Sequence, residues 1–195
     1  MTRPLRIAVA EDERNMREYL RELLPRLGHE VVAVEDGRQL VELCRTAPPD
    51  LVLTDIRMGE VDGLAAAAEI NRDAAIPVIL ISAHHDDELR ARARQEYVMA
   101  YLVKPVKQVD LEMAIDLAMM RFEHFQAVRQ EAAGLRQALE DRKLIERAKG
   151  ILMKKAGLDE ASAFRRLQKL ASDKNLKLVE VARILLTAEE AFLPS

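Results

Sequence analysis

The sequence of 195 residues has no tryptophan, one cysteine, 7 glycines and 7 prolines. The single cysteine, Cys44, cannot form an internal disulfide, and no cluster of cysteine and histidine has metal-ligand spacing, which excludes a disulfide framework and a structural zinc site. Little glycine and proline, with 49% hydrophobic and 32% charged residues, excludes a collagen-like or disordered chain. We therefore predict a helix-rich globular protein of one large or two small domains, with Cys44 in a helix core.

Long apolar runs are also missing. The longest, residues 74–83, is interrupted by Pro77 and is far shorter than the ~20 residues of a membrane-spanning helix. The chain reaches Glu11 and Asp12 without the apolar block of a signal peptide. We expect no membrane contact and a cytoplasmic protein.

Charge is unevenly distributed along the chain. Residues 1–142 carry 19 Lys and Arg against 26 Asp and Glu, a net charge of −7, whereas residues 143–195 carry 11 against 7, a net charge of +4. A basic carboxy-terminal segment indicates a polyanionic partner, although a solvated lysine-rich helix face gives the same count.

Short apolar runs rich in β-branched residues alternate with helix-length segments in the first part of the chain. The runs are Leu5–Ala10, Val31–Val34, Leu51–Leu53, Val78–Ile81 and, more weakly, Ala100–Val103. Continuous apolar strands separated by amphipathic helices are typical of a parallel sheet covered on both faces. We predict an α/β fold, a doubly wound (βα)5 parallel-sheet domain, within residues 1–122.

A long helix, or two in tandem, is predicted after Pro105, because residues 108–143 contain no strand-like run and only Gly134 as a breaker. Six of eight positions of a heptad seam are apolar; the seam is Ala118, Arg121, Phe125, Val128, Ala132, Leu135, Leu139 and Arg142. This pattern predicts a coiled-coil-like linker at residues 123–142 and a homodimer. An amphipathic helix packed on its own chain remains the alternative.

Helical periodicity with two breaks predicts a small three-helix bundle in residues 143–195. The expected helices are Lys143–Ala156, Asp159–Ser172 and Leu178–Ala191. The residues assigned to the core of this bundle are Leu152, Leu167, Leu170, Ile184 and Leu185.

Polar and charged residues follow four of the predicted strands. Glu11 and Asp12 come after the first strand, Asp55 after the third, Ser82 after the fourth and Lys104 after the fifth. Carboxyl ends of parallel strands meet at one sheet edge, where crowded carboxylates favour a hard cation such as Mg²⁺. A lysine and a hydroxyl beside them suit phosphoryl oxygens. Taken singly, the acids could be helix caps and the lysine a surface charge.

These residues resemble the receiver domain of two-component response regulators over roughly residues 4–122. The resemblance implies that Asp55 accepts a phosphoryl group from a sensor histidine kinase and that Ser82 and Lys104 contact it. It also implies that Mg²⁺ is bound by Glu11, Asp12, Asp55 and the backbone carbonyl of Arg57. Such a domain is a phosphoacceptor switch rather than an enzyme.

The resemblance extends to the switch region, with two departures. Tyr101 stands where the family has its switch aromatic, although an ordinary edge-strand tyrosine is the alternative, and Lys104-Pro105 matches a pair whose peptide bond is typically cis. Gly59 replaces a usual proline, and the segment 96–99 replaces a usual Gly-Ala pair.

The carboxy-terminal segment resembles the ANTAR family of RNA-binding antitermination domains. The resemblance rests on Ala148-Lys149-Gly150, on Glu160-Ala161 with Phe164, and on the late Val181-Ala182 pair. It implies binding to a pair of RNA hairpin loops, which prevents a transcription terminator from forming.

The candidate RNA-binding residues are Lys143, Arg147, Lys149, Gly150, Lys154, Phe164, Arg165 and Lys169. The basic side chains could form one face for phosphates. Gly150 within a helix favours a close approach, either by another helix or by RNA backbone. Phe164 could stack on an unpaired base or lie in the core.

We predict a phosphorylation-dependent response regulator that dimerises, binds tandem-hairpin RNA and acts as a transcription antiterminator through residues 143–195. Two alternatives are a receiver-controlled DNA-binding regulator, for which no helix-turn-helix is evident, and a protein-interaction adaptor.

Overall fold

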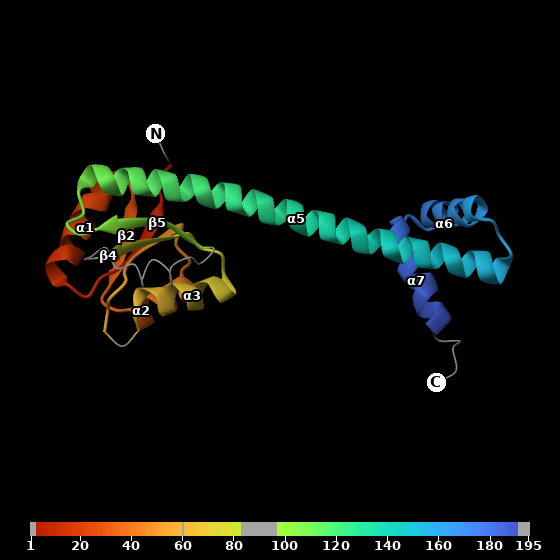
Figure 1. Cartoon of the computed structure of the whole chain (residues 1–195), viewed down its shortest axis with the longest axis horizontal. Helices are drawn as coiled ribbons and strands as arrows, with labels where there is room; N and C mark the ends of the chain where they lie inside the picture. Colours follow the sequence, from red (N-terminus) through yellow and green to blue (C-terminus); the bar gives the residue numbers. More distant parts are fainter. Residues whose placement is uncertain (1–2, 60, 83–96, 191–195) are drawn as a thin grey trace. The chain divides into compact units, whose positions relative to one another are not determined.

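The computed structural model describes residues 3–59, 61–82 and 97–190 and divides into two compact units, Met1–Gln126 and Ala127–Ser195. Helix α5, Gln108–Ala156, contributes to both units (Figure 1). The predicted domain boundaries after residues 122 and 142 fall within this helix and stay predictions. Among the described helices, none combines the length and apolar character that crossing a membrane requires.

The first unit contains a parallel sheet in the order β2-β1-β3-β4-β5. The strands are β1 Arg6–Ala10, β2 Glu30–Val34, β3 Leu51–Asp55, β4 Val78–Ser82 and β5 Val98–Val103. All five predicted strands and their parallel arrangement are confirmed. Each strand is mainly apolar because both faces of the sheet are covered.

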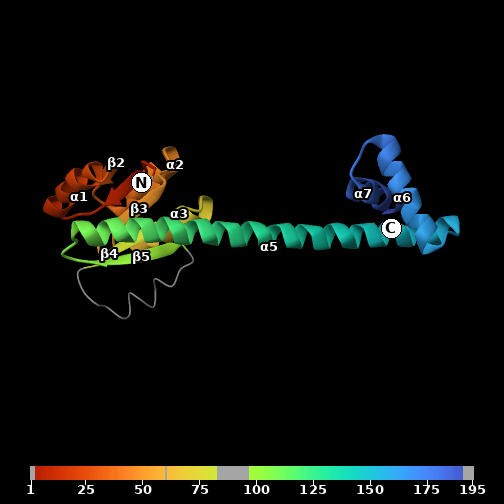
Figure 2. The same ribbon diagram turned by 90° about the horizontal axis from the view of Figure 1, so that it is seen from above.

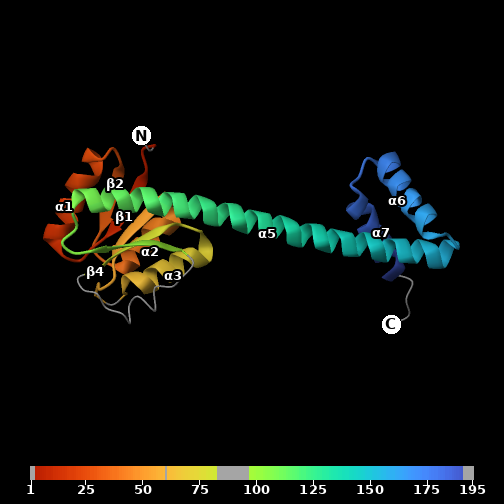
Figure 3. The ribbon, with the colours of Figure 1, turned by 45° about the horizontal axis from the view of Figure 1, so that its top comes forward.

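Helices cover the two faces of this sheet. Helix α1, Arg14–Arg26, and the start of α5 lie on one face, and α2, Gly37–Thr46, and α3, Gly63–Asp73, lie on the other (Figures 2 and 3). Alternate strand residues serve the two layers, so that Ile7 packs with α1 and α5 whereas Ala8 packs with α2 and α3. The helix expected between β4 and β5 lies outside the described residues.

The second unit is built by the end of α5 with α6, Glu160–Lys174, and α7, Leu178–Glu190. Gly157 and Asn175 have positive φ values of 63° and 51° and separate the helices where breaks were predicted. No break occurs at residue 143, so the predicted first helix of the bundle is the continuation of the linker helix.

The core of this second unit is small. Its buried members are Ala148, Leu167, Ala171, Val181 and Ala182, and Leu152, Leu170 and Leu185 pack against them. Assigning Ile184 to this core was wrong, because its side chain is 56% exposed. Val181, Ala182 and Leu185 define the inner side of α7, and Ile184 falls outside that stripe.

The heptad seam of α5 divides between two environments. Ala118 is buried in the first unit and Phe125 packs against the same core, so this part of the seam is packed on its own chain. Val128, Leu135 and Leu139 are 50%, 67% and 55% exposed. Only this later part of the seam is open to a second copy.

Gly63, the first residue of α3, must be a glycine for the helix to pack as it does. A Cβ at this position would overlap the carbonyl oxygen of Asp55. Backbone cannot yield as a flexible side chain does, so Gly63→Ala must displace either α3 or the end of β3. We expect a loss of about 1–3 kcal/mol in the free energy of unfolding, measured by urea denaturation. Gly134→Ala is the control, since no atom lies within 4 Å of its added Cβ, and it should not destabilise. Equal stability of the two variants would contradict the packing described.

A second prediction concerns His29, which is 9% exposed and accepts the backbone N–H of Leu5 on Nδ1 at 3.3 Å. Burial lowers the pKa of His29 below 6.5, although Asp116 and Glu112 oppose the shift. Protonation therefore favours the unfolded chain, and stability should fall as the pH drops below 6.5 towards the folded pKa.

The variant His29→Asn keeps an acceptor and does not titrate at this pH. Denaturation at pH 7 and pH 5.5 should show a larger loss for the unmodified chain than for this variant. Parallel losses would contradict the role of His29.

Candidate functional site

The carboxyl ends of the strands bring the predicted site together at one edge of the sheet. Glu11 and Asp12 follow β1, Asp55 ends β3, Ser82 ends β4 and Lys104 follows β5. Strands β1 and β3 are neighbours, and the strand order reverses beside β1. Doubly wound sheets bind ligands at such a reversal, because the loops that leave it diverge to opposite faces.

Lys104 lies between two of the carboxylates. Its Nζ donates to Oδ2 of Asp55 at 2.6 Å and to Oε1 of Glu11 at 2.9 Å. Burial alone would lower the pKa of Lys104, but the hydrogen bonds to Asp55 and Glu11 and the negative charges of these two residues together raise it. The ammonium is therefore charged at neutral pH and compensates part of the acidic cluster.

The acidic cluster retains an excess of negative charge. One carboxylate oxygen from each of Glu11, Asp12 and Asp55 lies within 4.8 Å of the other two. Nζ of Lys104 lies 2.9 Å from both Oε1 and Oε2 of the buried Glu11, so one ammonium serves both oxygens of this carboxylate. These oxygens are the donor set that a hard cation such as Mg²⁺ prefers.

Burial raises the pKa of Glu11; the hydrogen bond from Lys104 opposes this effect, and the charge of Asp55 adds to it. A buried carboxylate with a raised pKa gains from any further positive charge nearby. The residues present therefore fit a divalent cation.

Arg17 holds the backbone of Glu11 and Asp12 by hydrogen bonds, a role that was not predicted from the sequence. Its Nη1 donates to the carbonyl oxygens of Glu11 at 2.8 Å and Asp12 at 3.2 Å, and its Nη2 donates to Glu35 at 2.8 Å. Arg17 is only 9% exposed. The sequence offered one indication of this role: Arg17 lies one turn before Leu20, so a charged residue stands on the apolar side of α1.

The other predicted site residues lie around this cluster. The N–H of Arg57 donates to Oδ1 of Asp55 at 3.0 Å, and the carbonyl of Ser82 accepts from the N–H of Lys104 at 2.9 Å. Tyr101, on the edge strand β5, is 41% exposed. The Lys104–Pro105 peptide is cis, as predicted. The roles of Arg57 as a metal ligand, Ser82 as a phosphate contact and Tyr101 as a switch stay predictions.

The loop after β3 shows the effect of one departure from the family pattern. Gly59 has a φ of +25°, which proline cannot adopt because its ring holds φ near −65°. The second departure from the receiver-domain pattern is the segment 96–99, and its residue 96 lies outside the described residues.

In the second unit, Lys149 is withdrawn from the surface. It is 7% exposed, and its Nζ lies 2.8 Å from carboxylate oxygens of both Glu146 and Glu160. These hydrogen bonds, that to Glu146 first, raise the pKa of Lys149. The ammonium also lies 5.9 Å from the ring centroid of Phe164. Lys149 therefore joins the end of α5 to the start of α6 rather than forming part of an open basic face.

The remaining candidate cations are exposed. They are Lys143, Arg147 and Lys154 on α5, and Arg165 and Lys169 on α6. Each set lies on the side of its helix that faces away from the shared core. Phe164 is 36% exposed and lies at the border between core and surface. This position decides neither for stacking on a base nor for a place in the core.

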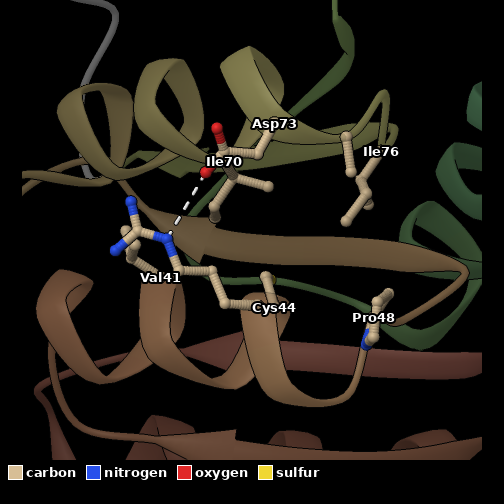
Figure 4. A pocket seen from close by; sticks show the side chains of 8 residues that line it. Val41, Cys44, Pro48, Ile70, Asp73 and Ile76 are labelled. Carbon is tan, nitrogen blue, oxygen red and sulfur yellow. Dashed lines mark hydrogen bonds and ion pairs between the residues drawn. The ribbon is translucent and has the colours of Figure 1, made fainter.

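An apolar pocket lies near the amino ends of the strands, at the end of the sheet opposite to the acidic cluster (Figure 4). This cavity of about 230 Å³ lies between α2 and α3 and is lined mainly by apolar side chains, including Val41 and Ile70. The ion pair from Arg45 to Asp73 crosses it at 3.4 Å. Cys44 also lines it but is 4% exposed, and burial raises the pKa of its thiol to about 11.

Comparisons with known proteins match both units. Residues 7–116 match the response regulator receiver domain family, and residues 133–186 match the ANTAR domain family. The chain is 42% identical over 184 residues to the transcriptional regulatory protein PdtaR of Mycobacterium tuberculosis, an alignment that covers 94% of this chain and 90% of that protein.

Solved structures agree on the first unit. The signal receiver domain of a modulated diguanylate cyclase from Desulfovibrio desulfuricans G20 has a TM-score of 0.57 at 30% identity and covers 62% of this chain and 97% of its own. A response regulator receiver domain protein from Clostridium thermocellum has a TM-score of 0.56 at 28% identity, covering 60% and 96%.

The support that Arg17 gives to the acidic pair can be tested by metal binding. Arg17→Gln removes hydrogen bonds to the backbone that carries Glu11 and Asp12, so we expect Mg²⁺ affinity to fall about tenfold in calorimetric titration of the whole chain. Arg21→Gln is the matched control on α1, because Arg21 pairs with exposed Glu18 at 3.7 Å. An affinity unchanged in Arg17→Gln would show that the acidic loop holds its shape without this residue.

Proposed function

Because this chain belongs to the response regulators that join a receiver domain to an ANTAR domain, we propose that it is a phosphorylation-controlled transcription antiterminator that binds structured RNA. Its donor is a sensor histidine kinase. The observation that carries the receiver half of this proposal is the contact of Lys104 with Asp55 at a carboxylate-rich sheet edge. A cytoplasmic location belongs to the same proposal, because nascent transcripts are found there.

Asp55 is the proposed phosphoacceptor. One of its carboxylate oxygens attacks phosphorus in line, forming an acyl phosphate as the bond from phosphorus to the donor breaks and the donor leaves with the electron pair. The N–H of Arg57 and the ammonium of Lys104 hold the two oxygens of this carboxylate in place beforehand. Lys104 then stabilises the charge on the transferred oxygens.

Glu11, Asp12, Asp55 and the carbonyl of Arg57 are the proposed holders of Mg²⁺, which when bound supplies further charge stabilisation to the phosphoryl group. The three carboxylates, whose oxygens lie within 4.8 Å of one another with one ammonium between them, support this assignment. Ser82, at the end of β4, is the proposed hydroxyl contact to phosphate. Movement of Ser82 would be followed by Tyr101 on the neighbouring strand β5.

The proposed output is RNA binding by residues 143–195. The net charge of +4 in this segment and the exposed cations of α5 and α6 support a polyanionic partner. The ANTAR match of residues 133–186 favours RNA over duplex DNA. Phe164, with about a third of its side chain exposed, is a candidate for stacking on an unpaired base.

Dimerisation completes the proposal. Val128, Leu135 and Leu139 form the exposed part of the seam on α5, and a second copy of the same helix would bury them. Two linked RNA sites bind paired hairpins more tightly than one, because the second contact becomes intramolecular. We propose that phosphorylation of Asp55 promotes this dimer.

The experiment uses a pool of RNAs in which two hairpins carry randomised loops, with single-hairpin RNA and duplex DNA as controls. Gel-shift titration of the whole chain is run with and without acetyl phosphate and Mg²⁺, alongside light scattering. Preferred binding of tandem RNA, strengthened as the mass doubles, supports the proposal. Base-specific DNA binding would instead support a DNA-binding regulator. A chain that binds neither nucleic acid would refute the proposed output and favour a protein-interaction adaptor.

Substitution of the phosphoacceptor gives the sharpest prediction. Asp55→Asn keeps the size of the side chain but is a far weaker nucleophile, so stimulation of RNA binding by acetyl phosphate should disappear, whereas basal RNA binding should persist. Asp50→Asn, with a carboxylate beside β3 but outside the cluster, is the control and should keep full stimulation. Stimulation that survives in Asp55→Asn would refute the proposed switch.

A further inference from the structure

Gly150 is an exposed glycine in the interior of α5. Glycine within a helix costs about 1 kcal/mol relative to alanine, and its missing side chain allows another group to approach the helix closely. Here a Cβ added to Gly150 would have no atom within 4 Å among the neighbours in the described chain. The close approach that the sequence predicted at this position is therefore not made by α6 or α7.

Three basic residues and one acidic residue lie near Gly150 on the same side of α5, and the acidic one, Glu146, is paired with Lys149. Lys143 stands seven residues before Gly150, Arg147 three residues before it and Lys154 four residues after it. At these helical spacings the three basic residues and Gly150 lie on one stripe of α5. Arg147 and Lys154 have no ion-pair partner within residues 97–190. Lys143 pairs with Glu140 at 2.7 Å, and both side chains of that pair are about 60% exposed. Such a pair is readily exchanged for another anion.

The stripe lies on the solvent side of α5. The opposite side of this helix carries Ala148, which is fully buried, and Leu144 and Leu152, which pack on the core. Lys149, held by two carboxylates, is not part of the stripe. Its positive charge is already compensated, whereas Arg147 and Lys154, on either side of Gly150, have no ion-pair partner within residues 97–190.

We infer that the α5 stripe around Gly150 seats the phosphate backbone of the bound RNA. The missing side chain lets the backbone lie against the helix, where Lys143, Arg147 and Lys154 reach phosphates on either side of the contact. This inference rests on the proposed function and assigns the backbone contact to α5.

A second copy of the chain is a poorer occupant of this surface. A symmetric dimer through the stripe would bring three cations of one copy against the same three of the other, and like charges repel. The apolar positions suited to self-association are Val128, Leu135 and Leu139, all earlier on α5. Charge complementarity therefore selects a polyanion.

The test compares two glycine variants of the whole chain. Gly150→Ala and Gly134→Ala make the same change at exposed positions of the same helix, and neither added Cβ meets a neighbour. Both should keep or raise the melting temperature, because alanine favours the helix. We expect Gly150→Ala to bind the RNA selected from the tandem-hairpin pool about tenfold more weakly, and Gly134→Ala to bind it as the unmodified chain does.

A charge variant provides an independent readout. Lys154→Gln should reduce the slope of log affinity against log salt concentration by about one, whereas Lys107→Gln, the same change in the first unit, should leave the slope unchanged. Equal slopes in the two variants would overturn the phosphate assignment.

The outcomes separate this inference from the proposed function. If the unmodified chain binds the selected RNA and Gly150→Ala binds it equally well, the seat on α5 is wrong and the proposed function stands. If Gly150→Ala loses dimer mass together with RNA affinity, the glycine serves an interface between copies and the inference is overturned. If no RNA in the pool binds the unmodified chain, the proposed function itself fails.

Discussion

The site at the sheet edge depends on one imbalance of charge. A parallel sheet brings the ends of β1 and β3 side by side, and their carboxylates would repel one another if Lys104 did not lie between Glu11 and Asp55. One ammonium cannot neutralise three carboxylates, so the cluster remains prepared for additional positive charge. The backbone around it is held by other means: Arg17 grips the carbonyls after β1, and Gly63 allows α3 to lie against the end of β3.

Much of this site was predictable from the sequence because it depends on topology. Apolar runs mark buried parallel strands, and any residue that directly follows such a run must lie at the carboxyl edge of the sheet. Glu11, Asp55 and Lys104 could therefore be placed together from the order of residues alone. Arg17 could not be assigned in this way, since its partners are backbone carbonyls, and no side-chain pattern in the sequence reveals which carbonyls lack a donor.

The second unit was less predictable for a related reason. The number of basic residues can be read from the sequence, but which of them are exposed cannot. Lys149 is withdrawn from the surface because it pairs with Glu146 and with Glu160, and the second pair forms only when α6 packs on α5. Similarly, the helical period allowed Ile184 to be assigned to the core, whereas packing selected the neighbouring stripe of α7. In a core as small as this one, a shift of one position around the helix decides whether an apolar side chain is enclosed.

The burial of Cys44 makes this chain convenient for site-directed labelling. The only thiol of the protein is 4% exposed, and its pKa of about 11 leaves almost none of it as thiolate at neutral pH. A cysteine introduced on a solvated helix face would therefore react with maleimide or spin-label reagents far faster than Cys44. Probes on either unit could then report distances in the unphosphorylated and phosphorylated protein with the native cysteine left in place.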